Sequence, residues 1–256
     1  MQDFELQIQK FLVQFIDKGA YRDVLMGLEN TIKIAITGFI LGIIIGTAIA
    51  VVRVLPKNKL KPKSGSPLKR FLSYFVSYII PKSLDAFCAF YVGVFRGTPI
   101  VVQLLVFYFV ALPLMGFNRV DSVNVAIIVF GMNSGAYISE IMRGGILSVD
   151  PGQMEGGRSV GMSYGATMIK IVIPQAVKNI LPTLGNEFIA LIKETSVVSF
   201  VGAVDLYKTF RSIGAATYQY MVPYLVMAVI YIVIVMIITM LIKIMERWLR
   251  KSDRGR

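Results

Sequence analysis

The sequence predicts an all-α integral membrane protein with about five transmembrane helices. The chain is strongly apolar: its mean hydropathy is +0.67, and 16% of its 256 residues are charged, whereas about a quarter are charged in an average soluble domain. Four runs contain no Asp, Glu, Lys or Arg: 34–52, 97–118, 122–139 and 212–242. A membrane-spanning helix needs roughly 20 apolar residues, so each run is a candidate span.

The distribution of basic residues predicts the orientation in the membrane. The chain has 27 Lys and Arg against 15 Asp and Glu, and no acid occurs among the bases from residue 53 to residue 82. A second basic cluster follows Ile242. Lys and Arg gather on the cytoplasmic side of membrane helices, so we expect the 53–82 segment and the C-terminus inside and the N-terminus outside. Bases placed in this way do not indicate a nucleic-acid partner.

Three regions follow from this pattern. Residues 1–27 are expected to be an amphipathic lead-in at the outer surface, residues 28–250 the membrane domain, and residues 251–256 a basic cytoplasmic tail. The first span is predicted over 28–52, and its glycines recur every four residues at positions 38, 42 and 46. Small residues at this spacing let helices approach closely in lipid, although glycines are also simply tolerated in membrane helices.

The connection over 53–95 is predicted to be cytoplasmic or interfacial. Its first part mixes lysines with prolines and serines, as a solvated linker does. Residues 71–95 are apolar and aromatic, but Pro81, Lys82 and Asp85 interrupt them. We therefore favour an interfacial segment over a sixth span. The second span is expected from Thr98, a suitable N-cap, through Pro99 to Pro113.

The remaining spans are expected over 122–142, 175–192 and within 216–245. The span over 175–192 is the weakest, because Glu187 lies inside it and Pro182 can kink it. Residues 193–215 are too polar to face lipid. Five spans with an external N-terminus place the C-terminus inside, in agreement with both basic clusters.

Residues 150–174 are predicted to form two short helices joined by a glycine. Asp150 can cap the first helix, Pro151 suits its first position, and Gln153 can complete a capping box. Gly161 allows a stop with positive φ, and Ser163 can cap a second helix that ends near Pro174. Such a compact unit could dock in a groove of a partner, or it could be an ordinary loop helix on the membrane surface.

This segment resembles the cytoplasmic signature of the permeases of binding-protein-dependent ABC importers. In that signature, Glu-Ala-Ala is followed after three residues by Gly and, nine residues later, by Ile-x-Leu-Pro. The chain matches it with Glu155, Gly161, Ile171, Ile173 and Pro174. It departs from it at Gly156 and Gly157, where the family usually has alanines, and at Ile173. Each glycine costs roughly 1 kcal/mol in a helix interior, so we expect this helix to form firmly only when docked.

Further motifs resemble the polar amino acid branch of these permeases, the histidine, arginine, glutamine and glutamate types. They extend the resemblance over residues 25–250 and comprise Arg96-Gly97-Thr98-Pro99 with Gln103, Tyr137-x-x-Glu140 with Arg143-Gly144-Gly145, Gly152-Gln153, Leu181-Pro182, Asn186 and Lys193-Glu194-Thr195-Ser196. The long 53–90 connection exceeds what this branch usually has, and its role is open.

The resemblance implies a type I ABC importer transmembrane domain with a cytoplasmic coupling helix, in a prokaryotic cytoplasmic membrane. An external solute-binding protein would deliver the substrate, and a second permease subunit, identical or paralogous, would complete the pathway through the lipid. ATP and Mg²⁺ would be bound by a partner ATP-binding subunit, and this chain would hold no cofactor. The residues implied in coupling to that subunit are Glu155, Gly156, Gly157, Gly161, Ile171 and Pro174.

The residues themselves also argue against an enzyme. The sequence has no Gly-x-x-x-x-Gly-Lys phosphate loop and no histidine, so His-based triads and His-containing metal sites are absent, and we predict no metal site. A secondary transporter or channel for a polar solute is the alternative function. Such a protein would not need the glycine-jointed segment, and it would usually contain internal repeats, which the sequence does not show.

Polar residues inside the spans are the candidate substrate site. Asn133, Tyr137 and Glu140 follow the spacing i, i+4, i+7 and share one helical face, and Asn186 and Glu187 lie on the next span. A face with an amide, a phenol and a carboxylate suits an amino group or a cationic side chain, so a basic or neutral polar amino acid is the predicted cargo. The alternatives are an ion pair of Glu140 with Arg143 and hydrogen bonds that only join neighbouring helices.

Overall fold

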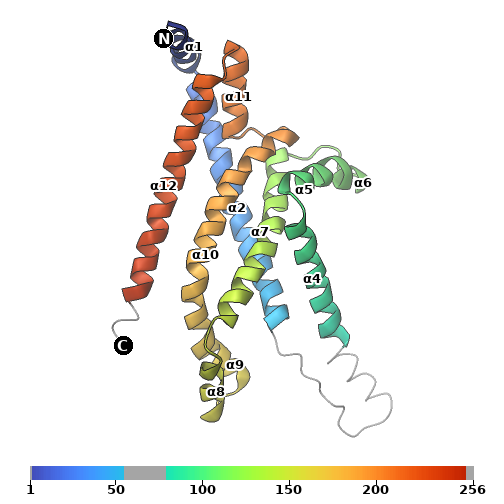
Figure 1. Ribbon diagram of the computed structural model, residues 1–256. Helices are drawn as coiled ribbons and strands as arrows, with labels where there is room; N and C mark the ends of the chain where they lie inside the picture. Colours follow the sequence, from blue (N-terminus) through green and yellow to red (C-terminus); the bar gives the residue numbers. More distant parts are fainter. Residues whose placement is uncertain (1, 55–78, 252–256) are drawn as a thin grey trace. The chain divides into compact units, whose positions relative to one another are not determined.

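The computed structural model describes residues 2–54 and 79–251, and within them the regular structure is entirely helical (Figure 1). The α-helices are α1 (Gln2–Leu12), α2 (Ala20–Val54), α4 (Ile80–Gly97), α5 (Ile100–Val106), α6 (Leu112–Leu114), α7 (Ser122–Leu147), α8 (Pro151–Ser159), α9 (Tyr164–Thr167), α10 (Ile173–Glu194), α11 (Leu206–Thr217) and α12 (Met221–Lys251). Short π-helical turns, η1 (Val13–Asp17), η3 (Phe107–Ala111) and η4 (Met168–Val172), and a 3₁₀ segment, η5 (Thr195–Val201), connect some of them.

The predicted all-α membrane class is confirmed. Among the described residues, α2, α7 and α12 are long and apolar enough to cross a membrane, and α4 with α5 is a fourth candidate in the form of a bent pair. Helix α10 covers the expected span over 175–192 but does not reach the same hydropathy, because Lys178 and Glu187 interrupt it. The first span begins earlier than expected, since α2 already starts at Ala20.

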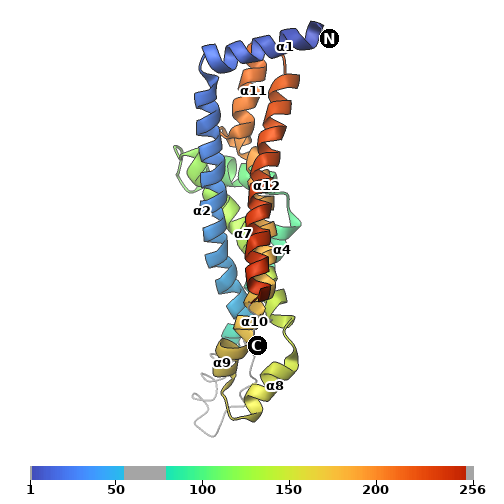
Figure 2. The same ribbon diagram turned by 90° about the vertical axis from the view of Figure 1, so that its left-hand side faces the viewer.

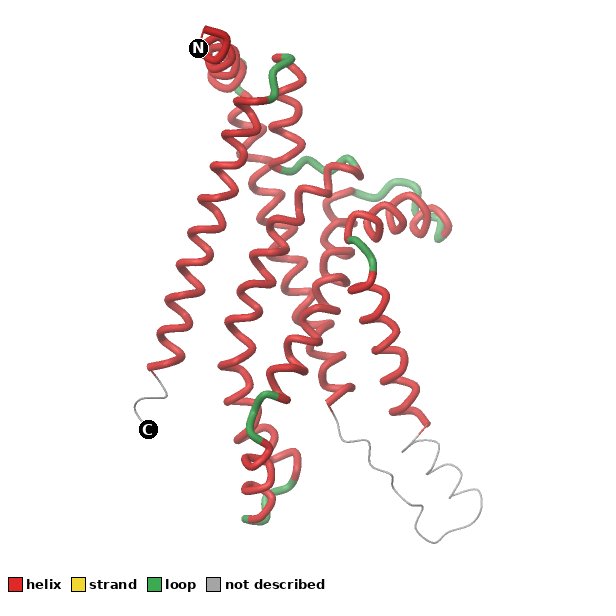
Figure 3. The backbone as a smooth tube through the Cα atoms, viewed as in Figure 1, coloured by secondary structure: helices red, strands yellow, loops and turns green. Residues whose placement is uncertain are grey.

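The expected second span is helical in the structure, because α5, η3 and α6 follow one another without a gap from Ile100 to Leu114. What the sequence did not predict is that it forms a bent pair with α4: the two meet at Thr98–Pro99 with a bend of 107°, and Figure 3 marks this break between α4 and α5. Thr98 is extended (φ −126°, ψ 145°), the conformation that a following proline imposes by steric conflict. Its hydroxyl donates a hydrogen bond to Val94 O at 2.8 Å, at the end of α4.

The described part of the 71–95 segment is also helical rather than interrupted. Because α4 begins at Ile80, Pro81 lies at its first positions, where no amide donor is lost. Lys82 and Asp85 then lie in the first two turns, and the apolar body of the helix follows them. The linker at 55–78 and the tail at 252–256 lie outside the described residues, so their assignments stay predictions.

The structure separates into two compact units. One comprises Met1–Leu41, Ile100–Gly131 and Leu181–Arg256, and the other comprises Gly42–Pro99 and Met132–Ile180. In the first unit, α1 lies across the ends of α2, α11 and α12 (Figure 2). The four helices share one apolar core: Phe11, Ala20, Val24, Leu206, Phe210, Ile213 and Val222.

Two hydrogen bonds attach the loop before α11 to α2 within this unit. The Asn30 side chain donates to Val204 O at 2.8 Å, and the Leu206 N–H donates to Thr31 Oγ1 at 3.2 Å. Asp205 caps α11, because its carboxylate accepts from the N–H groups of Tyr207 and Lys208. The start of α11 is therefore fixed to the N-terminal part of α2.

In the second unit, the later half of α2 packs closely against α7. A Cβ added to Gly42 would lie 2.9 Å from Ser134 Cβ, and one added to Gly46 would lie 2.7 Å from Ile138 Cγ2. Both glycines are therefore required for close approach of the two helices, which is the interpretation that their spacing suggested. Tyr91 of α4 donates to Met132 O at 2.6 Å and joins α4 to the same part of α7.

Candidate functional site

Residues 150–174, which we call the knob, begin with the caps that the sequence predicts. The Asp150 carboxylate accepts a hydrogen bond from Gly152 N at 2.8 Å, and Pro151 occupies the first turn of α8. Ser163 caps α9 by accepting from Ala166 N at 3.2 Å. The expected capping box differs, because the Gln153 side chain accepts from Gln175 Nε2 at 3.2 Å. Gln153 therefore ties α8 to the start of α10.

Gly161 ends α8 in the left-handed region, with φ +88°. The Met162 N–H donates to Gly157 O, and the Gly161 N–H donates to Arg158 O, both at 3.1 Å. This pair of bonds is a Schellman motif with Gly161 as its left-handed residue. A residue with a Cβ is disfavoured at this φ, so the predicted positive-φ stop is present and turns the chain from α8 into α9.

The two glycines that replace the family's alanines have different surroundings. A Cβ on Gly157 would lie 2.4 Å from Thr167 Cγ2, whereas one on Gly156 would meet no heavy atom within 4 Å. Thr167 is fully buried, and Ile171 lies on the same side of Gly157. Gly157 thus lets α8 pack directly on the following helical turn, and Gly156 faces open space.

Pro174 does not end the second short helix, which corrects our expectation. The backbone stays helical from α9 through η4 into α10, and the wider π-helical turn over Met168–Val172 ends two residues before the proline. Single π-turns of this kind occur mostly inside longer α-helices. The knob is therefore continuous with α10. At its base, a Cβ on Gly145 would lie 2.2 Å from Ile180 Cγ1, and Asn179 donates to Ser148 Oγ at 2.9 Å.

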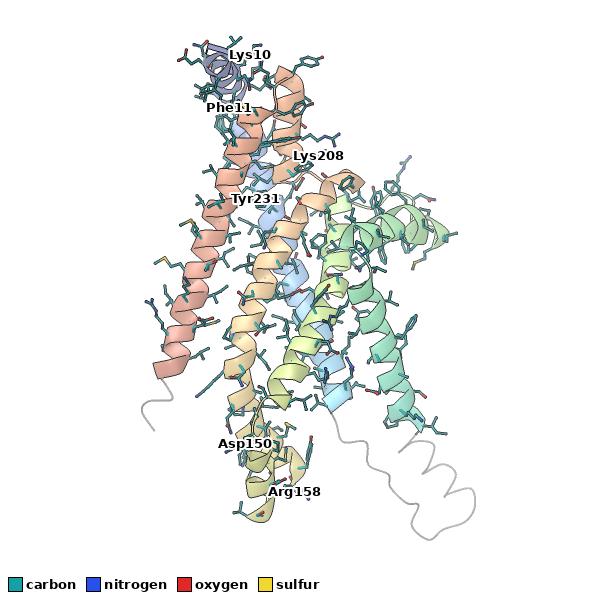
Figure 4. All side chains as sticks on the ribbon, in the orientation of Figure 1. Lys10, Phe11, Asp150, Arg158, Lys208 and Tyr231 are labelled. Carbon is teal, nitrogen blue, oxygen red and sulfur yellow. The ribbon has the colours of Figure 1, made fainter. Side chains whose placement is uncertain are left out.

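The surface of the knob carries most of the predicted coupling residues. Glu155, Gly156, Gly161 and Pro174 are exposed, whereas Gly157 is buried and Ile171 half-buried. Figure 4 shows Asp150 at the base of the knob and Arg158 nearer its tip. Val160 beside the turn is 78% exposed, and sequence analysis did not single it out. The exposed surface of the knob therefore carries an apolar side chain, Val160, close to the charged side chains of Glu155 and Arg158.

The polar face of α7 turns partly toward the end of α4. Asn133 donates to Phe95 O at 3.2 Å and is 6% exposed. The guanidinium of Arg96 lies over the Tyr137 ring, 5.3 Å from its centroid. Two of the three residues predicted to share this face therefore contact consecutive residues of α4.

Glu140 is held by two arginines. One carboxylate oxygen forms an ion pair with Arg53 of α2, and the other accepts from Arg143 at 2.7 Å and 3.1 Å. The ion pair with Arg143, which was one interpretation of the sequence, is present, and Arg53 adds a link between helices. Asn186 and Glu187 lie on α10 in the first unit, where Asn186 is exposed and Glu187 half-buried.

Sequence analysis missed Arg53 and Arg96 as site residues. Arg53 belongs to a basic cluster that indicated only topology, and its pairing with Glu140 joins residues 87 positions apart. Arg96 had a local signal, since it directly precedes the Gly-Thr-Pro break after an apolar run. In the part of the chain that the structure describes, no three His, Cys, Asp or Glu side chains gather as a metal site would require.

Comparisons with known proteins agree with this architecture. Residues 71–251 match the family described as binding-protein-dependent transport system inner membrane component. The chain is 36% identical over 230 residues to the arginine transport system permease protein ArtQ of Bacillus subtilis, covering 90% of this chain and 94% of that one. It is 41% identical over 131 residues to the glutamine transport system permease protein GlnP of Escherichia coli, covering 50% and 59%.

A solved structure gives the same result for the fold. A chain of a crystal structure described as an amino acid ABC transporter with histidines matches with a TM-score of 0.75 and 34% sequence identity, over 91% of this chain and 97% of that chain. The family match covers more than half of the chain, and the similarity to ArtQ extends over nearly its full length. The chain therefore belongs to the family of inner membrane components of binding-protein-dependent transport systems, as the permease component of an ABC transporter rather than its ATP-hydrolysing subunit.

Proposed function

We propose that this chain forms the membrane pathway of an ATP-driven importer of polar amino acids. The observation that carries the proposal is the knob, in which two capped helices are joined by a Schellman turn and continue without interruption into α10. Such a rigid surface element suits insertion into a groove of a partner subunit. The names of the similar permeases, for arginine and glutamine, support amino acids as cargo.

The partner subunits follow from this role. A separate ATP-binding subunit would hold ATP and Mg²⁺, an external binding protein would deliver the amino acid, and a second permease, identical or paralogous, would complete the pathway. The most apolar window of α12 is not buried inside the described structure, which leaves it available to lipid or to the second permease. The knob would face the cytoplasm, and the N-terminus would lie outside.

The pathway is assigned to the predicted polar residues. We place Asn133, Tyr137 and Glu140 of α7 and Asn186 and Glu187 of α10 along it, since a polar amino acid crossing about 30 Å of hydrocarbon needs polar groups within the spans. Glu140 forms ion pairs with Arg53 and Arg143. Its role in the pathway is therefore to hold these side chains in place at its end of the polar face.

The test is reconstitution into liposomes with the ATP-binding subunit and the binding protein. We expect uptake of labelled arginine or glutamine that requires ATP and stops when a hydrolysis-deficient ATP-binding subunit is used. Uptake by this chain alone, driven by a proton or sodium gradient, would instead establish a secondary transporter, and uptake down a concentration gradient without either would indicate a channel.

A further inference from the structure

We propose that Arg96 binds the α-carboxylate of the transported amino acid inside the membrane. This inference rests on the proposed function and adds a residue and a ligand group to it. Arg96 lies in the last turn of α4, directly before the break at Thr98–Pro99. Broken helices at membrane depth recur at the substrate sites of transporters, so the place in the fold already favours a ligand.

The depth of Arg96 follows from its contact with Tyr137. Tyr137 lies 15 residues after Ser122 and 10 residues before Leu147 in α7, or about 22 Å and 15 Å from its ends at 1.5 Å per residue. The Arg96 guanidinium is 5.3 Å from that ring. It therefore lies well inside the span, where a charged residue is costly unless it serves a pathway or has a partner.

The N–H groups of the Arg96 guanidinium are available to donate hydrogen bonds to a ligand. Within residues 2–54 and 79–251, no carboxylate forms an ion pair with Arg96, and the residue is exposed. Its contact with Tyr137 is to the ring, which attracts the cation without using the N–H groups that point outward in the guanidinium plane. Those groups have the fork geometry that matches a carboxylate.

There is also room for a ligand beside Arg96. Gly93 lies one turn earlier on the same side of α4, and Gly97 follows directly. A Cβ added to either would meet no heavy atom within 4 Å. The surface of α4 beside Arg96 is therefore open at both glycines.

The charge of the surroundings selects an anion. The sole carboxylate described on this part of α7, that of Glu140, is shared by Arg53 and Arg143. Together with Arg96 and with Asp85, whose charge acts on Cys88 of α4 as that of Arg53 does, these groups leave an excess of one positive charge around the polar face. A cationic side chain would be repelled there, whereas the α-carboxylate that every amino acid carries would be attracted. The amino group or cationic side chain expected from the sequence must then lie elsewhere in the pathway.

The test measures recognition of the carboxylate directly. The complex of this chain with its ATP-binding subunit, in lipid nanodiscs and without the binding protein, is assayed for equilibrium binding of labelled L-arginine and L-glutamine. Unlabelled amino acids and their α-carboxamides, which lack the negative charge, serve as competitors. We expect the parental complex to prefer the carboxylate at least about tenfold, as charge-assisted hydrogen bonds do.

Three variants complete the experiment. Arg96→Gln should bind the amino acids about tenfold more weakly and lose the preference for carboxylate over amide, and Arg96→Lys should keep the preference with lower affinity. Arg22 lies over the Tyr21 ring at 5.7 Å, near the start of α2, so Arg22→Gln removes a similar contact outside the site and should change nothing.

The outcomes separate this inference from the proposed function. If the parental complex takes up amino acids with ATP but Arg96→Gln keeps parental affinity and parental preference, the assignment of Arg96 is wrong and the importer function stands. Should Arg96→Gln not assemble with the ATP-binding subunit, unchanged affinity in Arg96→Lys overturns the inference. A parental complex that binds carboxylate and amide equally overturns it as well. If the parental complex takes up no amino acid with ATP, the proposed function itself fails.

Discussion

At the level of single residues, Glu140 joins α2 and α7 through its two arginines. The side chains of Arg53 and Glu140 are 20% and 18% exposed, so both are largely withdrawn from water. An ion pair of this kind adds little net stability when it is intact, but removing one partner leaves the other charge without compensation. The glycine contacts at Gly42 and Gly46 hold the same two helices together further from the end.

Glu140→Gln is therefore expected to weaken the structure. We expect a loss of about 1–3 kcal/mol, since two partly buried guanidinium groups lose their counter-charge. Thermal unfolding of the purified complex measures it, and Arg53→Gln should have a similar effect. The double variant should lose less than the sum of the two single losses, because both changes remove one interaction. Strictly additive losses would show that the pair contributes no coupling, and an unchanged melting temperature would contradict the structural role.

Gly156 and Gly157 provide a second comparison between neighbouring residues. Gly156→Ala should stabilise α8 by up to about 1 kcal/mol through helix propensity, because its Cβ enters open space. Gly157→Ala places a Cβ 2.4 Å from Thr167 Cγ2 and should cost about 1–3 kcal/mol by overpacking. Co-purification with the ATP-binding subunit and the melting temperature of the complex report both changes. Equal behaviour of the two variants would mean that α8 does not pack on Thr167 as described.

At the level of elements, the turn between α8 and α9 depends on Gly161. We expect Gly161→Val to leave the spans folded but to misalign the two short helices, because a β-branched residue is strongly disfavoured at φ +88°. Association with the ATP-binding subunit, or the stimulation of ATP hydrolysis by substrate, should then fall. Gly165→Val is the matched control, since Gly165 is helical and a Cβ there meets no heavy atom within 4 Å. If Gly161→Val associates with the ATP-binding subunit as the parental chain does, and substrate stimulates ATP hydrolysis to the parental extent, the docking role of the knob is refuted.

The elements also differ in how well the sequence predicts them. The two caps and the glycine stop of the knob were predictable, because Asp150, Ser163 and Gly161 act through local backbone geometry that their residue types determine. Helix α4 was not predictable. Pro81, Lys82 and Asp85 interrupt an apolar stretch of the sequence, but they do not break the helix, because it begins at Ile80 and they fall in its first turns. Local rules do not specify where a helix begins inside a longer apolar region.

The polar face of α7 shows the same limit of prediction from sequence for the candidate substrate site. The spacing of Asn133, Tyr137 and Glu140 placed them on one face of α7, but not their partners on other helices. Arg53 and Arg96 reach this face through tertiary packing, and no sequence period encodes such pairs. The sign of the charge at the site therefore became visible only in the structure.

At the level of the whole molecule, α2 contributes residues to both compact units. It begins in the core that it shares with α1, α11 and the start of α12, and at 35 residues it is about 52 Å long. Its last residues, Val51 and Val54, line an apolar cavity of about 320 Å³ together with Tyr164 and Met168 of the knob. The knob therefore lies beside the last residues of α2.

This arrangement gives the topology prediction. If the knob meets a cytoplasmic ATP-binding subunit, the 53–82 connection is cytoplasmic too, and α1 lies outside. Helix α12 starts in the same core as α1 and is long enough to cross a membrane, so the C-terminus is expected inside. Single cysteines introduced at Gln7, Ser64 and Ser252, in a chain whose native Cys88 is replaced by Ser, test this with an impermeant thiol reagent on intact cells.

Only the cysteine at position 7 should react before the cells are broken, and all three should react afterwards. Ser64 and Ser252 lie outside the described residues, so this measurement also assigns sides to segments that the structure leaves open. Reaction at position 64 in intact cells would place the basic connection outside, against the distribution of lysines that predicts it inside. It would also separate that connection from the knob, although the end of α2 lies beside it, and the docking of the knob to a cytoplasmic subunit would have to be abandoned.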